Sequence, residues 1–484
     1  MKLLHDNLMA FDYRLPIYNW FYPLAYDEIT SETRAKLNSN SINILNYAGA
    51  NSRFRALYFH IPFCEDICTF CPFYRVVNTD ELIFEYYTQA LVKEIEIKSK
   101  YVNISHYPVD AIFFGGGTPS ILTPTQIRKI GKALHEHFDL SRLKEFSYEC
   151  HLTTVSEDRI AAMKDIGVTH ARMGVQTFNP KYRKFFNLVE STDLIYRSVG
   201  LLTANFPFTS VDLLYGMHGQ TFTEFVQDLN HVVQLNTPTI DVYPINNVVT
   251  QTKLHKELHE NNMEATSGFS KTLMAVILRE YMWKSGYLPH NGHGFVKVDS
   301  KDLAVRPVVT DQYRFQYHEA HFGYKNHDII GFGSGAWSIT DGFIIENPKP
   351  WKSYMDDLHK NANLNMKLYE FDPLVCESKG VAFHLPYHGE ADKEKINWQL
   401  VRPEVIERLQ AAIARGLVVE TPTHYRLTDL GWLWYGNLLY YLSPNSEQEK
   451  INAFIAETNA VGNRFVENSS IDLNFPDCAI KTLL

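Results

Sequence analysis

Six short runs rich in apolar and β-branched residues recur between residues 53 and 250, each followed by a stretch of helical periodicity or polar loop character. The runs are ALYFHI, VDAIFFGG, FSYECH, VTHARMGV, FTSVDLLYG and PTIDVYPI. Such alternation is typical of a parallel sheet whose strands are connected by helices. Six units are too few for a closed eight-stranded barrel. The sequence therefore predicts an α/β fold built on a partial (βα)6 barrel of the TIM type.

The regions before and after this barrel are expected to extend it. Residues 1–52 are predicted to form an N-terminal extension that packs on the barrel of residues 53–250. Residues 251–364 are predicted to form a barrel extension and connecting region. In this region SGFSKTLMAVILREYMWKSGY predicts a helix, and DIIGFGSGAWSIT predicts a strand that enters a turn permitted by glycine.

The last region, residues 365–484, has a different character. The stretch from Pro403 to Leu442 predicts helix, short strand, turn, short strand and helix, which is the order of a winged-helix module. Such modules often bind DNA, but this one is acidic to neutral and ends in aromatic residues. We therefore expect a mostly α-helical, winged-helix-like domain with a lid or packing role.

The charge of the chain limits its partners. The 484 residues are 45% apolar and carry a net charge of −9, without a stripe or tail of Lys and Arg. This argues against nucleic acids and anionic membranes and favours a small-molecule substrate. The N-terminus lacks a secretory signal, and no apolar run approaches the ~18 residues of a membrane span. We expect a cytoplasmic monomer.

Three cysteines, Cys64, Cys68 and Cys71, are crowded directly after the first predicted strand. The other three cysteines are scattered, at Cys150, Cys376 and Cys478. This is no disulfide framework. A structural zinc ion would need a fourth ligand, whereas three cysteines on a cubane iron–sulfur cluster leave one iron open. The cluster therefore fits best; the alternatives are buried free cysteines, or a zinc site completed by His60 or a distant cysteine.

Polar or glycine residues end several predicted strands. They are Cys64, Gly115 to Thr118, Glu149, Gln176 and Asp212. Because active sites of such barrels lie at the C-terminal ends of strands, we expect these residues to meet at one mouth. The three glycines allow the backbone to approach a ligand, and Glu149 can accept from a ribose diol or pair with an ammonium group. A simple turn and a solvated strand end are the structural alternatives.

The cysteine spacing CxxxCxxC, with Phe70 before the last cysteine, resembles the radical S-adenosylmethionine (SAM) superfamily. The motifs LYFHIPFC, FFGGGTPSIL, MGVQTFN and VDLLYGMHGQT are similar to one branch of it, over about residues 50 to 440. This HemN-like branch includes oxygen-independent coproporphyrinogen III dehydrogenase, the haem chaperones, and the class C radical SAM C-methyltransferases and cyclopropanases.

The resemblance implies a [4Fe-4S] cluster held by Cys64, Cys68 and Cys71, with SAM on the fourth iron. Reduction of the cluster then cleaves SAM to a 5′-deoxyadenosyl radical. The positions that match contacts to this SAM are Tyr58, Gly116, Glu149, Asn246 and Trp337. The positions that match contacts to a second SAM are Phe70, Gly117, Thr118, Gln176 and Asp212.

Two positions depart from the coproporphyrinogen enzyme. Phe73 stands where that enzyme has a further cysteine, and Leu188 lines up with an arginine that contacts the second SAM. Arg183 lies nearby in the sequence and is a candidate substitute. His218, His290 and His293 are candidate acid–base groups or haem ligands, although isolated histidines are more often structural.

The resemblance leaves three functional hypotheses. The first is a two-SAM enzyme that methylates or cyclopropanates an sp² carbon of a small planar or apolar metabolite. The second is tetrapyrrole chemistry, either oxidative decarboxylation of coproporphyrinogen III or anaerobic opening of the haem ring. The third is a haem-binding trafficking protein without turnover. Either enzyme would need a reduced electron donor of the flavodoxin or ferredoxin type.

Overall fold

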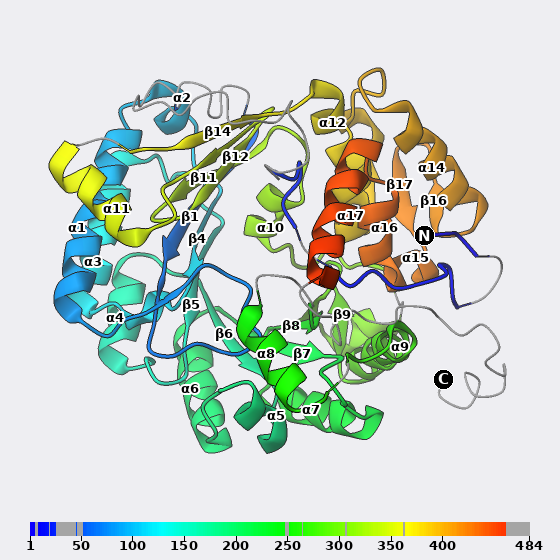
Figure 1. The fold of residues 1–484 in the computed structure, drawn as a ribbon, viewed down its shortest axis with the longest axis horizontal. Helices are drawn as coiled ribbons and strands as arrows, with labels where there is room; N and C mark the ends of the chain where they lie inside the picture. The colour runs from blue at the N-terminus through cyan, green and yellow to red at the C-terminus, as the bar shows by residue number, and fades with distance from the viewer. Residues whose placement is uncertain are drawn as a thin grey trace.

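The computed structural model describes residues 1–4, 8–18, 20–25, 45, 52–246, 251–263, 265–304, 307–361 and 364–460. Its centre is one large sheet of twelve strands in the order β14-β13-β12-β11-β1-β4-β5-β6-β7-β8-β10-β9 (Figure 1). The six predicted runs form parallel neighbours: β1 (Phe54–Ile61), β4 (Ala111–Gly116), β5 (Glu145–Cys150), β6 (His170–Gln176), β7 (Phe208–Tyr215) and β8 (Thr239–Pro244). The predicted partial (βα)6 barrel is confirmed.

The sheet extends beyond this parallel set at both ends. The predicted strand of DIIGFGSGAWSIT is β11 (His327–Phe332), which pairs in parallel with β1, so seven adjacent strands are parallel. The remaining strands are antiparallel: β12 (Trp337–Thr340), β13 (Phe343–Glu346) and β14 (Lys367–Glu370) beyond β11, and β10 (Gly294–Lys297) and β9 (Tyr287–Pro289) beyond β8. Among the described residues β14 and β9 are unpaired edges, so the barrel is open.

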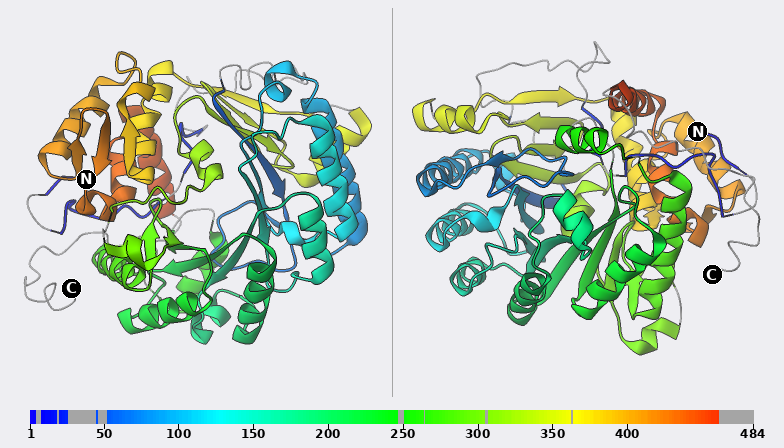
Figure 2. Two further views of the ribbon diagram at one scale, coloured as in Figure 1. Left: turned by 180° about the vertical axis from the view of Figure 1, so that it is seen from behind. Right: turned by 60° about the horizontal axis from the view of Figure 1, so that its bottom comes forward.

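Helices connect the parallel strands and cover the outer face of the sheet (Figure 2). They are α1 (Glu81–Lys98), α2 (Val102–Ser105), η2 (Pro119–Ile121), α3 (Pro124–His137), α4 (Glu157–Asp165), α5 (Pro180–Phe185), α6 (Thr192–Asn205) and α7 (Phe222–Gln234). Helix α8 (Thr252–Glu260) follows β8 and lies at the mouth of the barrel. Local sequence fixes several starts: Thr123 with Gln126 and Thr221 with Glu224 form capping boxes at α3 and α7. Their apolar faces bury Leu134 and Leu229 in the core.

The segment after β8 brings further helices around the open side. They are α9 (Gly268–Lys284), which the sequence predicts, η3 (Ser300–Ala304), α10 (Gln316–His321), α11 (Trp351–Asp356) and η4 (Asp357–Asn361). Residues 313–318 turn inward: Tyr317 stacks on Phe113 of β4, and the Phe315 ring lies 4.0 Å from the Arg172 guanidinium carbon. This segment therefore lines the interior of the open barrel.

The C-terminal region has the predicted winged-helix order. A three-stranded sheet of β15 (Glu390–Asp392), β17 (His424–Leu427) and β16 (Val418–Glu420) lies among helical segments. These are α12 (Pro373–Glu377), η5 (Gly380–His384), α13 (Leu385–His388), η6 (Lys393–Lys395), α14 (Pro403–Ala414), α15 (Asp429–Leu433), α16 (Tyr435–Tyr441) and α17 (Asn445–Ala460). A small parallel pair, β2 (Phe63–Cys64) with β3 (Val76–Val77), completes the strands of the described chain.

The described N-terminal residues join the two parts of the molecule. Arg14 donates to Thr272 in α9, and the Tyr18 amide donates to Asn246 after β8, whereas the Leu15 amide donates to Asn437 in α16. The predicted division at residues 52, 250 and 364 stays a prediction. In the part of the chain that the structure describes, no helix is both long and apolar enough to span a bilayer.

Candidate functional site

The cysteine loop, residues 64–78, is fastened to the ends of β1 and β4. The amides of Gly117 and Thr118 donate to the carbonyls of Ile61 and Phe63 at 2.7 and 2.8 Å. The Asn78 amide donates to the carbonyl of Cys64 at 3.1 Å and so closes the loop. Backbone hydrogen bonds thus fix both ends of the segment that carries the three thiols.

The middle of the cysteine loop reaches across the mouth of the barrel. The Thr69 amide donates to the carbonyl of Phe186 after α5 at 2.9 Å. Gln251 and Lys253, at the start of α8, donate to the carbonyls of Phe70 and Ile67. The loop therefore contacts the β1–β4 side and the β6–β8 side of the barrel at once.

The three thiols of the cysteine loop lie close enough to influence one another's pKa. Within the described residues the sulfurs do not form a group with all ligand atoms within 4.8 Å of one another. Burial raises the pKa of Cys64 to about 11 and that of Cys68 to about 12, and Cys71 raises both further. His60 is no fourth ligand, because Tyr58 and the carbonyl of Tyr74 contact its two ring nitrogens at 2.9 and 3.0 Å.

Neighbouring protein atoms occupy the space beside the glycine turn after β4. A Cβ on Gly117 would lie 2.7 Å from the carbonyl oxygen of Phe63 and 2.8 Å from the carbonyl carbon of Pro62. Gly116 has φ +108°, and its missing side chain leaves room for the His60 ring. These glycines let β4 pack against the cysteine loop; their contact with a ligand stays a prediction.

Gly117→Ala is therefore expected to displace the cysteine loop. The new methyl group meets backbone, which cannot rotate away, so we expect a loss of about 1–3 kcal/mol in the free energy of unfolding and less iron after reconstitution. Gly200→Ala is the control, since nothing lies within 4 Å of that Cβ on α6 and the helix should gain about 0.5–1 kcal/mol. Urea unfolding and iron analysis measure both; equal iron in the two variants would contradict the packing argument.

Glu149, at the end of β5, lies between the cysteines and the barrel interior. Burial and then the charge of Asp212 raise its pKa to about 8, while Arg172 and an amide hydrogen bond from Gly116 lower it. Tyr58 and Tyr317 both interact with this carboxyl, and their rings stack with centroids 5.8 Å apart. Tyr58, Phe113 and Tyr317 therefore form an aromatic wall beside one buried carboxyl group.

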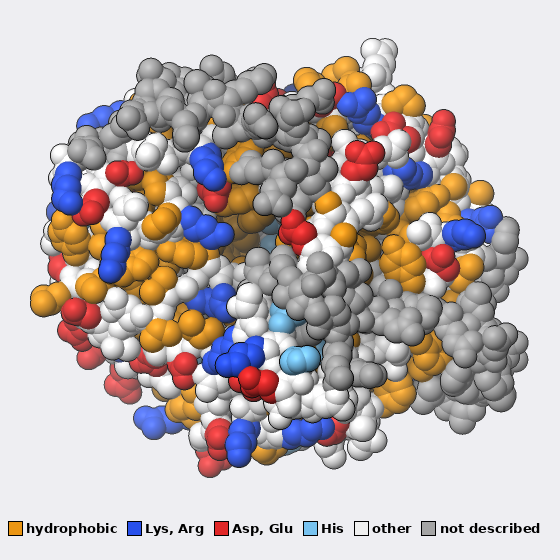
Figure 3. Space-filling model, in the orientation of Figure 1, with side chains coloured by type: hydrophobic (Ala, Val, Ile, Leu, Met, Phe, Trp, Pro, Cys, Tyr) orange, Lys and Arg blue, Asp and Glu red, His pale blue; other side chains and the backbone are white. Residues whose placement is uncertain are grey.

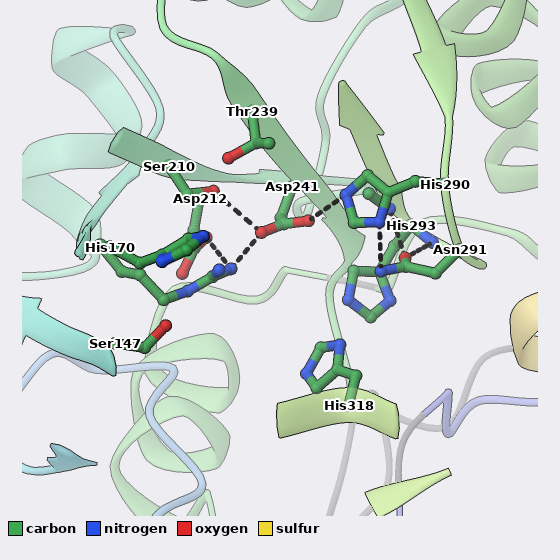
Figure 4. Close-up of polar contacts among 12 residues, drawn as sticks. Ser147, His170, Ser210, Asp212, Thr239, Asp241, His290, Asn291, His293 and His318 are labelled. Carbon is green, nitrogen blue, oxygen red and sulfur yellow. Dashed lines mark hydrogen bonds and ion pairs between the residues drawn. The ribbon is translucent and has the colours of Figure 1, made fainter. Parts of the chain in front are cut away.

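The barrel interior is polar where a closed barrel would be aliphatic. Alternate positions of β6, β7 and β8 place His170, Arg172, Ser210, Asp212, Thr239 and Asp241 inside (Figure 4). Arg172 forms an ion pair with Asp241 and lies 3.7 Å from Asp212. Burial raises the pKa of Asp212 to about 7 although Arg172 lowers it, and Asp212 Oδ1 has no hydrogen bond among the described residues. This oxygen is the one that faces Arg172.

Two of the residues predicted to contact a second SAM lie on opposite sides of the cysteine loop. Thr118 is buried and donates to Cys64 Sγ at 3.6 Å. Phe70 packs edge-on against Phe186 at 5.2 Å, in an apolar cluster that also contains Leu188. Leu188 therefore extends an apolar wall at the position where an arginine was expected.

Gln176 has left-handed backbone (φ +70°) at a β-bulge next to Asp212 on the neighbouring strand. Arg183 does not substitute for the missing arginine. Its guanidinium is buried and donates to the carbonyls of Val175, Thr177 and Val189. Gln176 thus lies beside Asp212, whereas Arg183 serves the local fold.

Asn246 and Trp337 lie at opposite sides of the open sheet. Asn246 follows β8 and accepts from the Tyr18 amide at 3.2 Å. Trp337 begins β12, where it stacks on Phe21 and packs with Tyr58 in one hydrophobic cluster. Nine of the ten predicted SAM contacts are partly exposed and only Thr118 is buried, so they border a space and do not fill the core. Figure 3 shows one face of the molecule, and near its centre lies a hollow with hydrophobic side chains at the bottom.

The comparisons with known proteins agree with this geometry. A profile of the radical SAM superfamily matches residues 58–232. Oxygen-independent coproporphyrinogen III oxidase of Synechocystis is 26% identical over 359 residues, 73% of this chain and 74% of that protein. Anaerobilin synthase of Escherichia coli O157:H7 is 26% identical over 405 residues, 81% of this chain and 85% of that protein. Residues 58–232 form a radical SAM domain, and most of the chain is similar to enzymes of the HemN-like branch. Its fold matches the structure of coproporphyrinogen III oxidase (HemN) from Escherichia coli with a TM-score of 0.68, at 22% identity over 83% of this chain and 92% of that one.

The cofactors of a radical SAM enzyme are a [4Fe-4S] cluster and SAM, and the described residues fit them. Three cysteine thiols at the spacing CxxxCxxC are the ligand set that a [4Fe-4S] cluster with one open iron requires. Their raised pKa values mean that the thiolates need the positive charge of a metal centre. The pKa of the nearby Glu149 carboxyl is raised. A positively charged ammonium group close to this carboxyl would lower the pKa again.

The histidine candidates of this radical SAM enzyme behave differently from one another. His290 Nε2 lies 3.9 Å from Asp241 (Figure 4), and His293 Nε2 contacts the Tyr387 hydroxyl at 3.1 Å. His318, which sequence reasoning missed, contacts the same hydroxyl. Burial lowers the pKa of His290 to about 4 and that of His293 to about 3, so both are neutral. His218 is also buried, below the other side of the mouth near Lys271.

Sequence reasoning also missed Arg172 and Asp241. Both interrupt otherwise apolar strands, in VTHARMGV and PTIDVYPI, and an ionisable residue in the middle of such a run is a usable signal. Their pairing depends on strand order: β6 and β8 both neighbour β7, so opposite charges on the outer two strands meet across it.

Proposed function

We propose that this radical SAM enzyme acts on a tetrapyrrole, with haem as the favoured substrate and coproporphyrinogen III as the second candidate. The proposal rests on the number of residues over which the chain is similar to tetrapyrrole enzymes. The match to anaerobilin synthase covers 405 residues, far more than the shared cofactor domain at residues 58–232. Likeness outside that domain concerns the parts that shape a substrate site. It supports the tetrapyrrole alternative better than methylation or cyclopropanation of a small metabolite.

The lining of the barrel supports a planar apolar substrate with few carboxylates. Phe113 and Tyr317 stack at 4.4 Å and Tyr58 lies parallel to both, which offers ring faces to a macrocycle. Arg172 is already paired with Asp241 and Asp212, so its charge is neutralised within the barrel. Haem has two propionates and coproporphyrinogen four, and this neutralised interior favours haem.

Different residues of the described structure would bind the cofactors and exclude water. A [4Fe-4S] cluster on Cys64, Cys68 and Cys71 would bind SAM at its open iron and supply a 5′-deoxyadenosyl radical for hydrogen abstraction. Glu149 and Tyr58 would hold that SAM by its polar groups. Phe70, Phe186 and Leu188 would exclude water from the cluster side of the mouth, which protects reactive species from quenching.

A second SAM is proposed to bind beside Asp212 and Gln176. Asp212→Asn is therefore expected to lower substrate turnover at least about tenfold, because the Oδ1 that lacks a hydrogen bond in the described structure loses its charge. Substrate-independent formation of 5′-deoxyadenosine should stay within about threefold of wild type. Mass spectrometry of both products separates these rates, and a parallel loss of the two would count against a separate second SAM.

The deciding experiment is anaerobic turnover by the reconstituted protein. The protein is loaded with iron and sulfide, reduced by flavodoxin or dithionite, and supplied with SAM and either haem or coproporphyrinogen III. We expect haem to be consumed with release of 5′-deoxyadenosine, and S-adenosylhomocysteine in addition if the second SAM donates its methyl group.

Each other outcome identifies an alternative. Carbon dioxide and 5′-deoxyadenosine from coproporphyrinogen III, without S-adenosylhomocysteine, would indicate oxidative decarboxylation. Stoichiometric haem binding without SAM consumption would indicate a carrier. If neither tetrapyrrole is bound or consumed while SAM cleavage proceeds, the tetrapyrrole proposal is wrong and the enzyme acts on another metabolite.

A further inference from the structure

Three side chains with metal-binding atoms meet outside the cysteine site. Glu319 comes from α10, His384 ends η5, and His388 ends α13 in the C-terminal region. One ligand atom of each lies within 4.8 Å of the other two. The two histidines are only 3% and 5% exposed, and the Glu319 side chain is 11% exposed.

The atoms that face one another lack hydrogen bonds. Within the described residues His384 Nδ1, His388 Nε2 and Glu319 Oε2 have no hydrogen-bond partner. His388 Nε2 and Glu319 Oε2 are 3.7 Å apart, too far for a hydrogen bond. Leaving a buried polar atom unpaired costs free energy, so such atoms are rare in folded proteins. Three such atoms around one point form an arrangement that a bound metal ion would satisfy.

The contacts behind these atoms hold them in a ligating orientation. His327 Nδ1 lies 3.4 Å from Glu319 Oε1 and 3.0 Å from the Glu319 carbonyl oxygen, which leaves Oε2 for another partner. The His388 ring hydrogen bonds to the backbone of His318. The His384 ring packs against Tyr324, with centroids 4.2 Å apart. Outer contacts of this kind orient the ligands of metal sites.

The local helix geometry brings the two imidazoles together. His384 and His388 are four residues apart on one helical face, and their ring centroids are 4.5 Å apart. His384 closes η5, a π-helical turn that runs directly into α13.

The donor set selects the class of metal. Two imidazole nitrogens and one carboxylate oxygen suit a divalent first-row metal such as zinc, and this ligand set contains no sulfur. Arg314, Lys395, Lys144 and Lys379 also act on Glu319, and Arg314 is itself paired with Asp311 and Glu390. Glu319 supplies the one carboxylate among the three ligands.

We propose that Glu319, His384 and His388 bind one zinc ion that joins α10 to the C-terminal region. Tyr387, next to His388, contacts His293 and His318 at the barrel interior. The zinc ion therefore fixes the position of the C-terminal region on the open side of the barrel. The proposal is independent of which substrate the enzyme takes.

Zinc binding to cluster-loaded protein tests the site, since the three cysteines are then occupied by iron. We expect one zinc ion per chain by mass spectrometry of metals, in addition to the cluster iron, and a higher unfolding temperature with zinc. Glu319→Gln and the double variant His384→Ala/His388→Ala should bind zinc at least about tenfold more weakly. His321 lies on α10, as Glu319 does, and is equally buried, so the control variant His321→Ala should bind zinc like the wild type.

A second measurement does not depend on variants that fold. Zinc-edge X-ray absorption of the wild-type protein should show nitrogen and oxygen neighbours at about 2.0–2.2 Å. A sulfur shell at about 2.3 Å would place the zinc at the cysteines and overturn the proposal. Absence of bound zinc from the wild type, or undiminished binding by folded Glu319→Gln and the double variant, would also overturn it.

Discussion

Alanine in place of Cys64, Cys68 or Cys71 is expected to abolish both the iron–sulfur chromophore and the cleavage of SAM. Each thiolate holds one iron, and two remaining cysteines cannot retain a cube whose fourth iron has no protein ligand. We expect iron and sulfide below about one tenth of the wild-type content. Iron and sulfide analysis, the visible spectrum and 5′-deoxyadenosine formation measure the effect after anaerobic reconstitution.

Cys376→Ala is the matched control for these variants. Cys376 is equally a free thiol, but it is buried in α12, far along the chain from the cysteine loop. This variant should keep its cluster and its SAM cleavage. A Cys68→Ala protein with full activity would refute the assignment of the triplet as the cluster ligands.

Arg172→Met is expected to give the largest loss of stability of any single change in the barrel interior. Methionine keeps an apolar stem over the Phe315 ring but leaves Asp241 and Asp212 without their cation. Removal of one partner from a buried ion pair costs about 3–5 kcal/mol, because the remaining charge stays desolvated. Urea unfolding of the full chain measures this change.

The pH dependence of that loss has a definite sign. Burial raises the pKa of Asp241, but Arg172, the two histidines His293 and His290, and the Ser210 hydrogen bond together outweigh burial and hold the pKa below its ordinary value. This contribution to stability is present above the unfolded-state pKa and disappears as pH falls through the folded-state pKa. The difference between wild type and Arg172→Met should therefore be larger at pH 7 than at about pH 3, below the ordinary pKa of an aspartate.

Two further variants separate charge from packing. Adding Asp241→Asn to Arg172→Met should recover part of the lost stability, because this change removes the unpaired, buried charge of Asp241. Arg128→Met removes an exposed pair with Asp165 and should cost less than about 1 kcal/mol. Equal losses for Arg128→Met and Arg172→Met would contradict the electrostatic account.

Local patterns were sufficient to predict the strands and the cluster ligands. The six runs became strands because apolar and β-branched side chains suit a sheet buried on both faces. Cys64, Cys68 and Cys71 were found because ligands within one loop have a readable spacing. The helix at α9 and the order of α14, β16 and β17 likewise follow from local periodicity and turns.

The missed features depend on contacts between distant parts of the chain. Arg172 and Asp241 pair only because β7 separates their strands, and Phe315 reaches them from a segment beyond β10. Glu319 meets His384 and His388 only after the C-terminal region docks. The close approach of Gly117 to the backbone of Pro62 and Phe63 likewise depends on the packing of β4 against the end of β1. The spacing of residues along the sequence does not reveal contacts between parts of the chain that are far apart.

The most direct test is the amount of 5′-deoxyadenosine that the reduced, reconstituted protein releases from SAM, with and without haem. The account predicts release that requires all three cysteines of the loop and rises when haem is present. A protein that holds four irons and four sulfides per chain, yet releases no 5′-deoxyadenosine under strong reductant, would contradict it.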